Sequence, residues 1–87
     1  MNEQLRVWHI QNPPNEPNWY DVAGPAEGIK KITELAEADL KNHSVWGNAF
    51  GLCVLDDDGD WVEWYDDEYN DIDTWADKNE VTRDPNA

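Results

Sequence analysis

NAFGLCVLDDDGDWVEWY, residues 48–65, decides the fold of this chain. Its first eight residues are apolar and rich in strand-forming types, and its last six alternate between the two faces of a strand. An Asp-Gly pair between two such runs is the strongest short-range signal of a β-hairpin. In the return strand we expect Val62 and Trp64 to face the core. Trp61, Glu63 and Tyr65 then share the opposite face.

The chain before this hairpin predicts two strands and one helix. LRVWHI, residues 5–10, alternates like a strand, and NWYDV, residues 18–22, is a second short strand that pairs back on it across a proline-rich loop. Residues 23–43 form the clearest element, because their apolar residues recur at three- and four-residue steps and give a helix one apolar stripe. That stripe contains Ile29, Ile32, Leu35, Ala36, Ala38 and Leu40.

The order strand, strand, helix, strand, strand predicts an α+β fold, in which a small antiparallel sheet carries one helix packed on one face. We expect residues 1–73 to form a single domain. Beyond Asp66 the sequence is acidic and loses its period, so residues 74–87 are predicted to be a flexible acidic C-terminal tail.

Composition narrows the function further. Twenty acidic residues against six basic ones give the 87-residue chain a net charge of −14. Such a surface disfavours binding to nucleic acid and to anionic membranes, and it favours basic protein partners. The single cysteine, Cys53, excludes an internal disulfide and suits a reducing cytosol. No apolar stretch approaches the roughly 20 residues that span a bilayer, and the first ten residues lack the pattern of a signal peptide. We therefore expect a cytoplasmic protein.

The motifs of metal sites and enzymes are missing from the sequence. A calcium loop with Gly59 at its sixth position would begin at Val54 and end at Tyr65, and neither residue supplies the required carboxylate. His9 and His43 have no third ligand at a spacing that suggests zinc. Carboxylates this dense form pairs by chance, so they do not indicate a glycosidase. We expect no metal, no cofactor and no enzymatic activity.

The acidic stretch that begins in the hairpin is the strongest candidate for a binding surface. Ten of the eighteen residues from 56 to 73 are acidic, and this density costs stability through self-repulsion. We expect a partner surface with Trp61 and Tyr65 as anchors and with its charge on Asp56, Asp57, Asp58, Asp60, Glu63, Asp66, Asp67 and Glu68. The partner is then a basic protein face, such as a nucleic-acid-binding host protein whose groove accepts a DNA-like row of carboxylates. The alternative is that the acidity serves only solubility.

Several segments together resemble a known family. LRVWHI with its proline-rich turn, EGIKKI, LAEADL, NAFGLCV and DGDWVEWYDDE are similar to small phage and prophage superinfection exclusion proteins of the gene-product-seventeen type. The resemblance covers about residues 5–73, and its most specific pieces are residues 48–52 and 61–65. It implies a role in phage–phage or phage–host conflict and supplies no catalytic residues. The alternative within this setting is a structural or regulatory phage protein without enzymatic activity.

Overall fold

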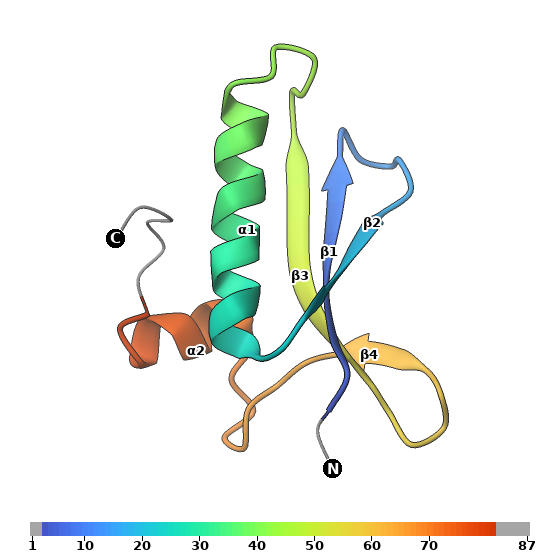
Figure 1. Ribbon diagram of the computed structural model, residues 1–87, viewed down its shortest axis with the longest axis vertical. Helices are drawn as coiled ribbons and strands as arrows, with labels where there is room; N and C mark the ends of the chain where they lie inside the picture. Colours follow the sequence, from blue (N-terminus) through green and yellow to red (C-terminus); the bar gives the residue numbers. More distant parts are fainter. Residues whose placement is uncertain (1–2, 82–87) are drawn as a thin grey trace.

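This computed structural model describes residues 3–81 of the chain, which contain four strands and two helices (Figure 1). In chain order they are β1 (Leu5–Gln11), β2 (Asn18–Val22), α1 (Pro25–Leu40), β3 (Asn48–Leu55), β4 (Trp61–Glu63) and α2 (Ile72–Lys78). The strands form one antiparallel sheet in the order β2-β1-β3-β4. The predicted α+β class is confirmed. Within residues 3–81, no helix is long and apolar enough to cross a membrane.

Strand register assigns each residue to one of the two faces of the sheet. Val7 lies opposite Tyr20 and Leu52, and these side chains share the face on which the helices pack, here called the inner face. The next residue, Trp8, lies opposite Trp19 and Gly51 on the other side, here called the outer face. The alternation that predicted β1 therefore divides the sheet into a core side and an outward side.

The hydrophobic core lies between the inner face and the two helices. Helix α1 runs alongside β3 in Figure 1 and contacts β1, β3 and β2. Its Ile29 is almost fully buried, with Leu52 and Val7 as the other large side chains sealed from solvent. The buried cluster as a whole comprises Leu5, Val7, Val22, Ile29, Leu52, Trp64, Ile72 and Ala76.

Helix α2 is an element that the sequence analysis did not predict, and the expected boundary at residue 73 falls inside it. Asp71 begins the helix, because its carboxylate accepts a hydrogen bond from the Thr74 N–H at 2.8 Å. Ile72 and Ala76 join the core, and the ring of Trp75 meets Trp64 edge-on with centroids 6.0 Å apart. The acidic residues of this segment therefore belong to a packed helix. Residues 82–87 of the expected tail lie outside the described residues.

The hairpin follows its prediction at the turn and departs from it in the return strand. Gly59 has a φ of +85°, the left-handed conformation expected for the Asp-Gly turn. Trp64 is buried as predicted. The prediction for Val62 was wrong, because its side chain is 42% exposed. Strand β4 is a three-residue edge strand, and α1 packs chiefly on the other three strands.

The last turn of α1 also differs from its predicted apolar stripe. Leu40 is 87% exposed, whereas its neighbour Asp39 is buried. The apolar stripe ends before this turn because Asp39 faces the sheet, where it accepts hydrogen bonds from polar side chains of β1 and β3. Turning Asp39 toward the sheet rotates Leu40 outward, since adjacent helical residues point about 100° apart.

Candidate functional site

Two acidic turns carry most of the predicted charge. In the acidic hairpin loop, residues 56–60, the Asp56 carboxylate accepts hydrogen bonds from the N–H groups of Asp58 and Asp60 at 3.0 and 2.8 Å. Asp57, Asp58 and Asp60 themselves are exposed. Asp56 therefore shapes the loop, and the other three carboxylates face solvent.

The second acidic turn, residues 66–70, repeats this design. Asp66 Oδ1 accepts hydrogen bonds from the N–H groups of Glu68 and Asn70 at 2.8 and 2.9 Å, and the Asn70 side-chain amide donates to Oδ2 at 3.0 Å. Hydrogen bonds from the side chain and the backbone of Asn70 hold the pKa of Asp66 below its usual value. Asp67 and Glu68 are exposed, and Glu68 lies 4.0 Å from Lys78.

A charged row crosses the outer face of the sheet. Asp21, Arg6, Cys53 and Glu63 lie side by side on β2, β1, β3 and β4. The Arg6 guanidinium donates through Nε to Asp21 Oδ1 at 2.7 Å. Burial raises the pKa of the Cys53 thiol, and the nearby Glu63 charge raises it further. Burial and the Glu63 charge thus both favour the protonated form of the Cys53 thiol.

Three tryptophans, Trp8, Trp19 and Trp61, lie on the same face of the sheet as this row. The indole of Trp8 lies against Gly51 of β3, since a Cβ added at Gly51 would lie 2.2 Å from the indole Nε1. Trp19 and Trp61 stand on opposite edge strands, yet their ring centroids are only 6.5 Å apart. The Arg6 guanidinium lies 4.4 Å from the centroid of Trp61. Trp19 and Trp61 thus extend from the two edge strands over the middle of the outer face, the face that also carries the buried Cys53.

The predicted anchors and charges therefore occupy different places. Trp61 and Glu63 lie on the outer face, as the alternation predicted. Tyr65 is 48% exposed and donates a hydrogen bond through its hydroxyl to Glu63, which raises the pKa of the phenol. Arg6, Trp19 and Asp21 were not predicted as site residues from the sequence. The alternation in residues 5–10 and 18–22 could have placed them together on one face once the two strands were paired.

A buried polar network lies at the opposite end of the sheet, on the inner face. Asp39 accepts hydrogen bonds from His9 Nε2 at 2.7 Å, Gln11 Nε2 at 2.7 Å and Asn48 Nδ2 at 2.9 Å. Burial alone would raise the pKa of Asp39, but these three bonds outweigh it and hold the pKa below its ordinary value. The His9 ring also stacks on Phe50 with centroids 4.7 Å apart. This network ties the end of α1 to β1 and β3.

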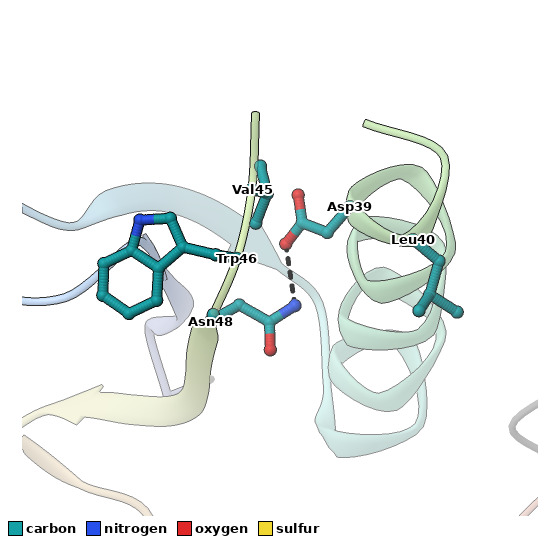
Figure 2. A pocket seen from close by; sticks show the side chains of 6 residues that line it. Asp39, Leu40, Val45, Trp46 and Asn48 are labelled. Carbon is teal, nitrogen blue, oxygen red and sulfur yellow. Dashed lines mark hydrogen bonds between the residues drawn. The ribbon is translucent and has the colours of Figure 1, made fainter. Parts of the chain in front are cut away.

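A shallow hollow of about 240 Å³ opens beside Asp39, lined by Asp39, Leu40, Val45, Trp46, Gly47 and Asn48. Figure 2 shows Asn48 turned toward Asp39, whereas the indole of Trp46 points away from the carboxylate. Trp46 is 77% exposed.

A His–Asp pair can serve catalysis when the second ring nitrogen of the histidine reaches a nucleophile, a substrate or a water molecule. Among residues 3–81, His9 Nδ1 has no hydrogen-bond partner, and Cys53 faces the other side of the sheet. The described part of the chain also contains no group of three His, Cys, Asp or Glu side chains placed to hold a metal ion. The hydrogen bonds that Asp39 accepts from His9, Gln11 and Asn48 hold the end of α1 on the sheet.

The amino-acid sequence of this chain is similar to that of a curated phage protein. The chain is similar to the superinfection exclusion protein of Salmonella phage P22, at 29% identity, and the match covers 71% of this chain and 77% of that protein. No protein-family model matches the chain. No solved structure matches it either. The match supports the resemblance to superinfection exclusion proteins drawn from the sequence, and the narrower gene-product-seventeen type stays a prediction.

Proposed function

We propose that this chain is a phage superinfection exclusion protein that binds a basic protein in the cytoplasm of the host cell. It acts by occupying a surface, without a catalytic step and without a cofactor. The similarity to the phage P22 protein supports the biological role. The net charge of −14 supports a basic partner.

The proposed binding mechanism rests on the arrangement of side chains on the outer face of the sheet. It presents the half-exposed Trp19 beside Trp61, with the carboxylates of Asp21 and Glu63 in the same strands. Aromatic side chains ringed by charge are the usual anchors of protein interfaces, where charge speeds encounter and aromatic burial sets the lifetime. The acidic hairpin loop, directly before β4, adds long-range attraction for a basic surface.

A narrower version of this proposal names the partner as a nucleic-acid-binding host protein. The support for it is the density of carboxylates in the acidic hairpin loop and the second acidic turn, which offers a basic groove a row of charges like that of DNA. In this version the chain competes with nucleic acid for the groove.

A plating assay tests the proposal. A Salmonella strain producing the chain is challenged with a panel of phages, and plaques are counted against the same strain with an empty vector. We expect at least one phage to plate poorly on the producing strain. The variant Asp57→Asn, Asp58→Asn, Asp60→Asn should restore plating, because the three exposed carboxylates steer the partner.

The matched control removes the same charge elsewhere. Glu16 lies in the proline-rich loop, Glu34 and Glu37 lie on α1, and all three side chains are exposed. Their change to glutamine should leave exclusion intact. Normal plating of every phage on the wild-type strain would contradict the exclusion role. Equal loss in both triple variants would show that total charge matters and that the hairpin position does not.

A further inference from the structure

We infer that Trp19 and Asp21, neighbours on the outer face of edge strand β2, form the site that receives an arginine side chain of the protein partner. This inference rests on the proposed function, since it specifies the chemistry by which the basic partner is recognised. Its test uses purified protein and defined peptides, so it can fail or succeed independently of exclusion in cells.

The chain already shows how this surface binds a guanidinium. Arg6 donates to Asp21 at 2.7 Å while its guanidinium lies 4.4 Å from the centroid of Trp61. A carboxylate and an indole thus hold one arginine between them. Trp19 lies two residues from Asp21 on the same strand, and its ring centroid is 6.5 Å from that of Trp61. On β2, Trp19 offers a second indole beside the same Asp21 carboxylate.

The second pair remains open to an incoming side chain. Arg6 engages only Oδ1 of Asp21, whose side chain is 82% exposed. Trp19 is 44% exposed. Strand β2 is at the edge of the sheet, so a partner can approach both groups without displacing another strand. A guanidinium stacked on the free side of Trp19 can therefore donate to the unused Oδ2 of Asp21.

The chemistry of the pair favours arginine over lysine. A guanidinium is planar and weakly hydrated, so it stacks on an indole while it donates to a carboxylate in its own plane. An ammonium is a strongly hydrated point charge and gains less from the ring. Among the strand residues of the outer face, Arg6 carries the one positive charge, against Asp21 and Glu63. The local negative charge thus attracts a cation, and stacking on the indole favours a planar guanidinium over an ammonium group.

Two peptides of equal charge test the inference. Hexa-arginine and hexa-lysine are titrated into the full chain while the indole N–H signals are followed by NMR. Attraction to the overall negative charge predicts the same affinity for both peptides. The arginine site predicts that hexa-arginine binds about two- to fivefold tighter, the gain from one exposed cation–π contact. It also predicts that the Trp19 signal shifts and the Trp46 signal does not.

Matched variants locate the effect. Trp19→Leu keeps apolar volume and should abolish the preference for arginine, whereas Trp46→Leu, at an exposed tryptophan elsewhere, should keep it. Asp21→Asn should weaken hexa-arginine more than Asp58→Asn does, although both remove one charge. In each variant, the indole N–H signals of the tryptophans far from the substitution should keep their wild-type positions, which verifies that the variant is folded.

Four results would overturn the arginine site: equal affinity for the two peptides, an arginine preference that survives Trp19→Leu, equal weakening by the two Asp→Asn variants, or a Trp19 shift caused by a single-stranded oligonucleotide. The last would identify a base-stacking surface in place of a protein site. An arginine preference in a chain that excludes no phage would support this inference and contradict the proposed function.

Discussion

Changing Asp39 to Asn tests whether the buried network holds α1 to the sheet. The substitution keeps the shape of the side chain but leaves one acceptor oxygen for the three donors from His9, Gln11 and Asn48. The new amide group then points its own hydrogens at one of those donors. His9 is buried and cannot turn to water, whereas Asn48 is exposed. We expect the free energy of unfolding to fall by about 2–4 kcal/mol. Most of this loss comes from the charge-assisted hydrogen bond of His9, and less of it from the bonds of Gln11 and Asn48.

Urea unfolding at neutral pH, followed by tryptophan fluorescence, measures this loss in the free energy of unfolding. Glu37→Gln, at an exposed carboxylate of the same helix, is the control and should change stability by less than about 0.5 kcal/mol. A comparably small change for Asp39→Asn would refute a stabilising role for the network.

The pH dependence gives the same prediction a second readout. The pKa of Asp39 in the folded chain is below its ordinary value of 3.8. The ionised carboxylate therefore stabilises the fold above pH 3.8, and this stabilisation is lost as the pH falls through the lowered folded pKa. The stability difference between wild type and Asp39→Asn should shrink as the pH falls through this acidic range. A difference that does not change there would show that Asp39 is not ionised in the folded protein.

Three further changes test local features of the fold. Gly51→Ala should destabilise the chain by about 1–3 kcal/mol, because the new Cβ would meet the Trp8 ring at 2.2 Å. Gly47→Ala, with nothing within 4 Å of its Cβ, is the control, and equal melting temperatures for the two variants would contradict the contact. Gly59→Val should cost about 1–2 kcal/mol, since it forces a β-branched residue to a φ of +85°. An unchanged melting temperature would show that the turn relaxes freely. Asp71→Ala should cost about 1 kcal/mol by removing the cap of α2, and thermal unfolding followed by circular dichroism would refute the cap if it detects no loss.

The features that could be predicted from the sequence are those set by neighbouring residues. The Asp-Gly turn, the alternation of residues 5–10 and the apolar positions at the start of α1 each encode structure within a few residues, so hairpin, strand and helix appear where expected. Helix α2 could also have been predicted from the sequence. Asp71 supplies a cap, and Ile72, Trp75 and Ala76 follow helical spacing. The acidic composition of that segment hid this pattern.

The features that could not be predicted depend on residues far apart in the chain. His9 and Asp39 are thirty positions apart, and nothing local indicates that a helical aspartate turns inward to meet a strand histidine. The approach of Trp19 to Trp61 depends on the strand order, which places β2 and β4 at opposite edges of the sheet. The candidate site was therefore only half visible in the sequence: its charges and Trp61 could be read from residues 56–68, but Arg6, Trp19 and Asp21 could not be joined to them.

In the proposed function, superinfection exclusion depends on the outer face of the sheet and not on acidity alone. Plating efficiency on cells that produce either of two double variants tests this dependence. Trp19→Leu with Asp21→Asn removes the open pair on β2, while Trp46→Leu with Glu37→Gln removes one exposed tryptophan and one exposed carboxylate away from the outer face. With both proteins present at wild-type levels, the account predicts that the first variant allows a superinfecting phage to plate normally and that the second still excludes it. Exclusion by the first variant at wild-type strength would contradict the claim.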